Sequence, residues 1–464
     1  MQQKYILEKP ENRRLILFFT GWSTDWRIIE EIILPSGYDL LCCWDYRVLS
    51  SPVPSKDYDE IMVIAWSFGI NAAQNILPVS SFINKVTGMY AINGTLYPVD
   101  NEKGIPCDIF KATCDNLNEE NLKRFRIRIA GGKSKYQAAN KRLKAQANIE
   151  DLKEELKLFG KINNLNKKGC SWDYAFISEN DKIFPMSNLV AAWKNTPFSI
   201  IKDGEHLPDF QRIFDLVIKD KKAIGKIFEK ASKSYADNAR VQNEIAKRLF
   251  DFSLNICKKG GKILEIGSGA GLLNRHIISN LNPAHFCVID LGKNEYDDNV
   301  EFIKGDIEVV IRKLQPEYFD MVISGSTMQW LHSPLRVILQ IERILKPGGY
   351  FIFSTFLKGN LKEISEQTGN SLLYLTEDQW KNTIEKTGLE IVVSETQEHV
   401  LRFDEVKEIF GHLKSTGVNA LTGKNKSIKE LREIMRNYPQ DNGKYTLSYV
   451  SYIMVLRKPT PPSK

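Results

Sequence analysis

The sequence lacks long hydrophobic runs, because no stretch of its 464 residues approaches the roughly 18 uninterrupted apolar positions of a membrane-spanning helix. Its first residues, MQQKYILEKPENRR, also lack the apolar core of a signal peptide. The seven cysteines form no CxxC pair, so neither a disulfide framework nor a cysteine-based metal site is indicated. We therefore expect a cytoplasmic protein with reduced thiols, no membrane association and no bound metal.

The length and charge of the chain indicate two globular domains. At 464 residues it is two to three times as long as a typical domain, so two domains of about 200 residues each are expected. A formal net charge of +7 is mild for this length and gives no indication of a nucleic-acid partner. A short charged run at residues 219–222 separates the halves, and no internal repeat relates them. We place the domains at residues 1–218 and 226–458.

The second half begins its alternation of strands and helices with a glycine-rich turn. The segment ILEIGSGAGLL places Glu265 at the end of an apolar strand and puts Gly267, Gly269 and Gly271 in the turn that follows. Glycine allows a sharp turn and a close approach of the backbone to a ligand. The GxGxG spacing differs from the GxGxxG of dinucleotide-binding turns. The pattern favours S-adenosylmethionine over NAD, because S-adenosylmethionine has no pyrophosphate to bind.

Two further acidic residues follow at the ends of the next predicted strands. Asp290 comes about 20 residues after the turn, where a carboxylate accepts hydrogen bonds from ribose hydroxyls. Asp306 follows the third strand and is placed either to bind an adenine amino group or to cap the next helix. With the residue after each carboxylate and the end of the fourth strand, the predicted cofactor contacts are Asp290, Leu291, Asp306, Ile307 and Ser324.

This order of strands and turns resembles that of class I methyltransferases, which implies a Rossmann-like α/β fold. The segment FEKASKSYADNARVQNEIAKRL (residues 228–249) and the phrase STMQW resemble the BioC-type malonyl-acyl carrier protein methyltransferases. The resemblance implies methyl transfer to the carboxylate of a malonyl thioester, with Tyr235 and Gln242 in a lid over the cofactor. Tyr235 is also compatible with a plain core position. One departure is Gly325, where the family often has asparagine.

The first half contains one serine in a setting typical of a hydrolytic nucleophile. AWSFG (residues 65–69) follows an apolar strand and precedes a helix, as a nucleophile elbow does, although Ala65 replaces the first glycine of GxSxG. The nucleophile would be Ser67. His206 is the only histidine in residues 1–225, so it is the one histidine of this half available to activate the serine.

The acid of such a triad is expected between the serine and the histidine. Asp181, in SENDKIFP, gives the chain order Ser, Asp, His that α/β-hydrolases use, while Asp173 and Asp203 are alternatives. The backbone N–H groups of Phe68 and Trp22 would form the oxyanion hole.

The segments FFTGW, AWSFG and GEHLP, in this order, resemble the BioG-type pimeloyl-acyl carrier protein methyl esterases over about residues 1–215. The resemblance implies an α/β-hydrolase fold and hydrolysis of a methyl ester, with the helical region from Ile109 to Lys168 as a lid. Two alternatives stay open. One is a small-molecule O-methyltransferase fused to an unrelated acyl hydrolase, and the other is a carrier-protein binding module with an inactive hydrolase half.

The predicted lid carries an excess of positive charge. Residues 123–148 contain nine basic residues and no acidic one, unlike the mixed charges of a solvated helix face. An acidic carrier protein suits this charge better than nucleic acid, since the segment lacks the interleaved aromatic residues that stack on bases. We expect the acyl carrier protein to bind here, through Arg124, Arg128 and Arg142.

Overall fold

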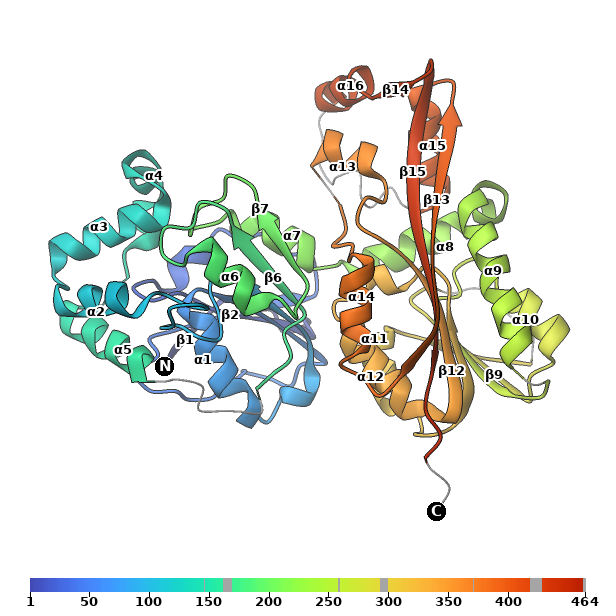
Figure 1. The fold of residues 1–464 in the computed structure, drawn as a ribbon, viewed down its shortest axis with the longest axis horizontal. Coiled ribbons are helices and arrows are strands. Elements are labelled where there is room, and N and C mark those ends of the chain that lie inside the picture. Colours follow the sequence, from blue (N-terminus) through green and yellow to red (C-terminus); the bar gives the residue numbers. More distant parts are fainter. Residues whose placement is uncertain are drawn as a thin grey trace. The chain divides into compact units, whose positions relative to one another are not determined.

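The computed structural model divides into two compact units, Met1–Ile218 and Lys219–Lys464 (Figure 1). It describes residues 1–145, 147–161, 169–257, 259–292, 299–369, 371–417 and 428–461. Residues 162–168, the end of the predicted lid, lie outside the described residues. The second unit takes in residues 219–225, which the sequence analysis left between the two domains.

The first unit is built on a seven-stranded sheet in the order β1-β3-β2-β4-β5-β6-β7. Strands β3, β2, β4, β5, β6 and β7 run parallel to one another. Strand β1, at the edge, runs antiparallel to β3. The central strands are short apolar runs, and β4 is buried along its whole length, as expected for parallel strands covered on both faces. The strands are β1 (Gln2–Leu7), β2 (Arg14–Phe19), β3 (Tyr38–Trp44), β4 (Glu60–Trp66), β5 (Val86–Ile92), β6 (Tyr174–Ser178) and β7 (Phe198–Ile201).

Four helices between β5 and β6 form an insertion in this unit, and Figure 1 shows them grouped at one side of it. They are α2 (Cys107–Asp115), α3 (Glu119–Ala130), α4 (Lys133–Leu143) and α5 (Ile149–Lys161). Capping explains the bounds of α3: the Asn118 side chain accepts from the N–H of Asn121, and Gly131 ends the helix with φ of 85°. The other helices of the unit are α1 (Phe68–Ile76), α6 (Met186–Trp193) and α7 (Phe210–Val217).

The second unit contains a sheet in the order β10-β9-β8-β11-β12-β15-β13, with β14 paired to β15. Strands β10, β9, β8, β11 and β12 are parallel, and β15 lies antiparallel between β12 and β13. The strands are β8 (Lys262–Ile266), β9 (His285–Asp290), β10 (Val300–Lys304), β11 (Phe319–Ser324), β12 (Leu345–Phe356), β13 (Glu390–Phe403), β14 (Gln440–Asp441) and β15 (Lys444–Arg457). The carboxyl ends of β8, β9, β10 and β11 therefore meet at one edge of the sheet, where ligands bind in such folds.

Helices connect the strands of the second unit and precede its sheet. They are α8 (Lys221–Asn238), α9 (Arg240–Ile256), α10 (Asn274–Leu281), α11 (Ile307–Val310), α12 (Pro334–Ile344), α13 (Lys362–Thr368), α14 (Glu377–Ile384), α15 (Val406–Ser415) and α16 (Ile428–Arg436). Within the described part of the chain, no helix has the length and apolar character needed to cross a membrane.

Two candidate active sites

Ser67 stands in a strained turn between β4 and α1. Its backbone has φ of 57° and ψ of −128°, a conformation that costs a non-glycine residue free energy and recurs at functional sites. Packing around the turn is tight: a Cβ on Gly69 would lie 2.5 Å from the carbonyl oxygen of Phe19, and one on Gly94 would lie 2.5 Å from that of Ser67. The turn places Ser67, which is 6% exposed, directly after the carboxyl end of β4, as a nucleophile elbow does.

His206 and Asp181 complete a hydrogen-bonded chain with this serine. His206 Nε2 lies 3.1 Å from Ser67 Oγ, and His206 Nδ1 lies 2.8 Å from Asp181 Oδ2. The other carboxylate oxygen of Asp181 accepts from the N–H groups of Ile183 and Phe184, at 2.7 and 3.0 Å. The His206 and Asp181 side chains are buried, with 1% and 0% exposed, so their hydrogen bond is shielded from water. This geometry suits proton transfer from the serine to the imidazole.

The two alternative acids are occupied elsewhere. Asp173, just before β6, accepts through Oδ2 from the N–H of Met89 on β5. Asp203 has φ of 54° in the turn after β7, where its N–H donates to Glu179. Of the three aspartates considered from the sequence, Asp181 is the one that the structure brings to His206.

The expected oxyanion-hole residues lie beside the serine. A Cβ on Gly21, which precedes Trp22, would lie 3.0 Å from Ser67 Cβ. Phe68 is the first residue of α1, so its N–H is one of those that have no acceptor within the helix. Trp22 and Phe68 line a cavity of about 530 Å³ together with the serine and the histidine. Further apolar walls come from Ile105, just before α2, and from the helical insertion, namely Ile109, Phe110, Phe125, Ile129 and Leu156.

The basic stretch of the insertion is less uniform than its sequence indicated. The expectation of a segment without counter-charges is wrong for Arg124, which pairs with Glu120, and for Lys135, which pairs with Glu205. Arg126 is buried and donates to the carbonyl of Ser23. Arg124 remains 70% exposed. Arg142, on α4, is half-buried, whereas Arg128 lines the cavity beside the serine.

The second unit holds a larger pocket, of about 960 Å³, at the carboxyl ends of β8 to β11. The glycine turn shapes it: Gly267 has φ of 73°, and a Cβ there would lie 2.1 Å from Thr327 Oγ1. Asp290 ends β9, and its two carboxylate oxygens accept from the N–H groups of Gly269 and Gly292, at 2.9 and 2.8 Å. These bonds hold the carboxylate at the wall of the pocket.

Two buried polar atoms at this pocket, Glu265 Oε2 and Gln242 Oε1, have no hydrogen-bond partner among the described residues, and Asp306 Oδ2 has only the ion pair with Lys221 at 3.5 Å. A buried polar atom without a partner is costly, so the pocket suits a ligand that brings donors to these oxygens. Burial, with a smaller contribution from Asp290, raises the pKa of Glu265 to about 8. Burial also raises the pKa of Asp290, although its backbone N–H donors oppose that effect.

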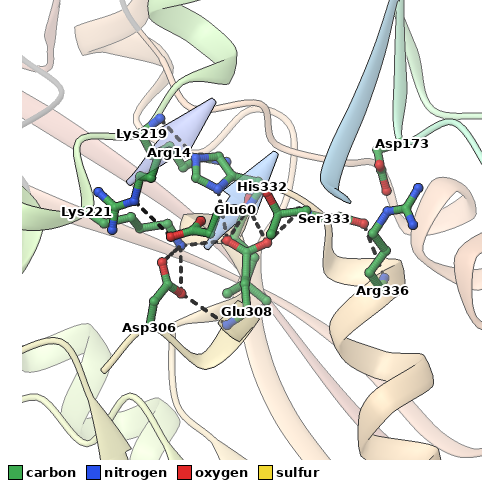
Figure 2. A network of polar contacts seen from close by, with 12 residues as sticks. Arg14, Glu60, Asp173, Lys219, Lys221, Asp306, Glu308, His332, Ser333 and Arg336 are labelled. Carbon is green, nitrogen blue, oxygen red and sulfur yellow. Dashed lines mark hydrogen bonds and ion pairs between the residues drawn. The ribbon is translucent and has the colours of Figure 1, made fainter. Parts of the chain in front are cut away.

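Asp306 belongs to a buried network that fixes the start of α8 to the pocket, and Figure 2 shows the side chains of Lys221, Asp306, Glu308 and His332 directed toward one another. Asp306 caps α11, and Lys221 Nζ lies 2.8 Å from Glu308 Oε2 and 3.5 Å from Asp306. Burial alone would raise the pKa of Glu308, but Lys221 and His332 outweigh it and hold the pKa well below its ordinary value. Asp306 is therefore the helix cap that the sequence allowed, and it also lines the pocket, so its role toward an adenine amino group stays a prediction.

Most of the expected cofactor residues line this pocket, namely Tyr235, Gln242, Glu265, Gly267, Gly269, Asp290, Leu291, Asp306 and Ile307. Two do not. Gly271 shapes the turn with φ of 75°, and the Ser324 hydroxyl donates to the carbonyl of Ile266, tying β11 to β8. Sequence analysis missed Lys221 and Thr327, which also line the pocket. Lys221 lay in the charged run that marked the domain boundary, a pattern that gave no sign of burial.

Comparisons with known proteins agree with this division. Residues 1–214 match the family "Pimeloyl-ACP methyl esterase BioG", and residues 264–353 match a methyltransferase domain family. With the strand order of the second sheet, the latter match identifies a class I methyltransferase-like α/β fold.

Known relatives extend along most of the chain. A malonyl-[acyl-carrier protein] O-methyltransferase of Bacteroides fragilis (strain 638R) is 32% identical, over 97% of this chain and 94% of that protein. One of Chlorobium phaeovibrioides is 30% identical, over 52% of this chain and 98% of that protein. The crystal structure of BioG from Haemophilus influenzae is 31% identical, with a TM-score of 0.41, over 45% of this chain and 94% of that one. The chain therefore belongs to the BioC-type malonyl-acyl carrier protein O-methyltransferase family, in a form that carries a BioG-type domain at its N-terminus.

Proposed function

We propose that the chain is a bifunctional cytoplasmic enzyme of biotin synthesis. Its second domain, residues 226–458, methylates the free carboxylate of malonyl-acyl carrier protein with S-adenosylmethionine. Its first domain, residues 1–218, is an α/β-hydrolase that removes the methyl ester from pimeloyl-acyl carrier protein. The observation that carries the esterase is the chain from Ser67 through His206 to Asp181.

The residues of the second pocket suit S-adenosylmethionine, which supplies an electrophilic methyl group when bound. Glu265 offers a buried carboxylate oxygen to the ammonium group, and Asp290 is held where ribose hydroxyls can donate to it. Asp306, which lines the pocket and lies 3.5 Å from Lys221, would accept from the adenine amino group. The substrate carboxylate is ionised at neutral pH, so methyl transfer needs no general base. The chain's task is to orient the acceptor and exclude water, with Tyr235 and Gln242 in the cover of the pocket.

Ester hydrolysis follows from the first site. Ser67 Oγ attacks the ester carbonyl while His206 Nε2 takes its proton, and Asp181 stabilises the imidazolium that forms. The N–H groups of Trp22 and Phe68 bind the negative charge that develops on the carbonyl oxygen. His206 then returns the proton to the departing methoxide, which leaves as methanol. Water attacks the acyl-serine with the same base and releases the free carboxylic acid.

The two reactions have opposite effects on a carboxylate: the second domain would esterify it and the first would hydrolyse the ester. A free carboxylate is costly to bury in the apolar tunnels of chain-elongating enzymes, and a methyl ester removes that cost. The helical insertion, about residues 109–168, would be the lid of the esterase and would bind the acidic carrier protein through Arg124, Arg128 and Arg142. Two alternatives considered from the sequence are a small-molecule O-methyltransferase fused to an unrelated acyl hydrolase and a carrier-protein binding module with an inactive hydrolase half. The experiment below distinguishes both from this proposal.

The test uses the purified chain with two carrier-linked substrates. Mass spectrometry should show one methyl group added to the acyl chain of malonyl-acyl carrier protein in the presence of S-adenosylmethionine. Pimeloyl-acyl carrier protein methyl ester should be hydrolysed by the wild-type chain and by Asp173→Asn, but not by Ser67→Ala or Asp181→Asn. All three variants should retain methyl transfer, because the substitutions lie in the other unit. Hydrolysis by Ser67→Ala at the wild-type rate would refute the triad.

A further inference from the structure

The helix α5 contacts both sides of the candidate oxyanion hole. On one side, the indole Nε1 of Trp22 donates to the carbonyl of Leu152, on α5, at 3.0 Å. On the other side, the ring of Phe159, also on α5, stacks on the ring of Phe68 with centroids 4.5 Å apart and an angle of 29°. Both residues whose N–H groups would bind the oxyanion therefore have side chains in contact with one helix.

A third contact reaches the same loop through Tyr46. Glu155, on α5, accepts from the N–H of Tyr46 at 2.8 Å. The Tyr46 hydroxyl in turn donates to the carbonyl of Thr20, at 2.9 Å, two residues before Trp22. The Tyr46 ring also meets Phe159 edge to face, with centroids 6.0 Å apart. The loop that carries the Trp22 N–H is thus bound to α5 at two points. Trp22 bonds to α5 directly, and Thr20 bonds to it through Tyr46.

These contacts are well built for positioning. Trp22, Tyr46 and Phe159 are at most 3% exposed, so each contact lies away from water. Nearer the surface, Arg47 forms ion pairs with Asp45, in the turn after β3, and with Asp151, on α5. These pairs link α5 to that turn. A helix that only covered the cavity would need apolar contacts with its contents. This one also accepts hydrogen bonds from the Trp22 indole and from the backbone N–H of Tyr46, in the turn after β3.

We propose that α5 is the support of the oxyanion hole, so that Trp22, through its bond to Leu152, and Glu155, through Tyr46, are positioning residues for ester hydrolysis. The inference rests on the proposed esterase function of the first unit. It gives the helical insertion a second role besides carrier binding, because the N–H groups aim correctly only while α5 is seated. Small displacements of such donors reduce the stabilisation of the transition state far more than they reduce substrate binding.

The test compares Trp22→Phe, which removes the indole N–H and keeps an aromatic ring, with Trp172→Phe. Trp172 is also buried, and its Nε1 donates to Gln74 at 2.8 Å, so the control loses a comparable bond away from the oxyanion loop. For a small soluble methyl ester, Trp22→Phe should lower kcat about tenfold or more with little change in KM or Tm. The Ki of an alkyl trifluoromethyl ketone, which forms a tetrahedral oxyanion on the serine, should rise by the same factor.

A second pair of variants tests the Tyr46 contact. Glu155→Leu should show the same loss in kcat and in ketone binding, whereas Glu155→Gln, whose amide oxygen still accepts the Tyr46 N–H, should restore most of both. The proposal is overturned if Trp22→Phe hydrolyses the ester at the wild-type rate, or if it and Trp172→Phe lose kcat, KM and Tm alike. If the wild-type chain shows no hydrolysis that depends on Ser67, the proposed esterase function itself fails.

Discussion

The proposed contact between Glu265 and the ammonium group of the cofactor predicts that cofactor binding depends on pH. Its pKa near 8 means that at pH 7 about one pocket in ten carries the carboxylate, and at pH 6 about one in a hundred. The proposed ion pair with the ammonium group of S-adenosylhomocysteine needs the charged form. The apparent Kd should therefore rise about fivefold from pH 8 to pH 7 and about ninefold from pH 7 to pH 6, and binding at pH 7 should release nearly one proton.

Isothermal titration calorimetry at pH 6, 7 and 8, in buffers with different ionisation enthalpies, measures both quantities. 5′-Methylthioadenosine, which lacks the ammonium group, should bind with a Kd that hardly changes with pH. Glu265→Gln should bind S-adenosylhomocysteine weakly and without proton release. A wild-type Kd that stays constant from pH 6 to 8, with no proton released, would show that Glu265 does not bind the ammonium group.

The same pKa affects the stability of the ligand-free second unit. Because the folded pKa of Glu265 lies above its ordinary value of 4.5, the protonated form is favoured by folding. This contribution is fully present below pH 4.5 and is lost as the pH rises toward 8. The stabilisation of this unit by S-adenosylhomocysteine should therefore be greater at pH 8 than at pH 6, and thermal unfolding with and without the ligand measures it.

Three further variants test other parts of the two sites. Asp290→Ala should weaken S-adenosylhomocysteine binding by about 2 to 3 kcal/mol through loss of hydrogen bonds to the ribose, and unchanged affinity in calorimetry would move that contact elsewhere. Reversing Arg124 and Arg142 to Glu should raise KM for the carrier-linked ester about tenfold and weaken its salt dependence. Neither residue lines the cavity, so the rate on a small ester should stay within about threefold, and equal losses on both substrates would indicate misfolded helices. Lys221→Met leaves Glu308 buried without its ammonium partner and should destabilise the second unit by about 3 to 5 kcal/mol, whereas an unchanged Tm would contradict the importance of the network.

The sequence alone determined much of the second unit. Apolar strands, the glycine turn ending in Gly271 and the spacing to Asp290 predicted a class I methyltransferase-like fold, and the family comparison confirmed it. Such features are local: they depend on the conformational freedom of glycine and on the regular return of strands to one edge of the sheet. The same reasoning also expected Gly271 and Ser324 at the ligand, and neither lines the pocket, because spacing along a turn does not say which residue faces it.

In the first unit the sequence named Ser67, Asp181 and His206 by elimination and chain order. Their catalytic role and the hydrolase fold remain proposals, but the distances between them are properties of the tertiary structure alone. Residues 114 and 139 positions from Ser67 reach it only because β4, β6 and β7 end at the same edge of a parallel sheet.

Two features had no signal in the sequence. Lys221 reads as part of a solvated charged run, yet it is 3% exposed and paired to Glu308, since burial of a charge depends on a counter-charge 87 residues away. The contacts of α5 with Trp22 and Phe68 likewise join segments that local patterns cannot relate. Sequence determined which residues can do chemistry and which segments form strands and helices. Tertiary structure decided which of those residues meet, because contacts between distant segments depend on how the sheet and the inserted helices pack.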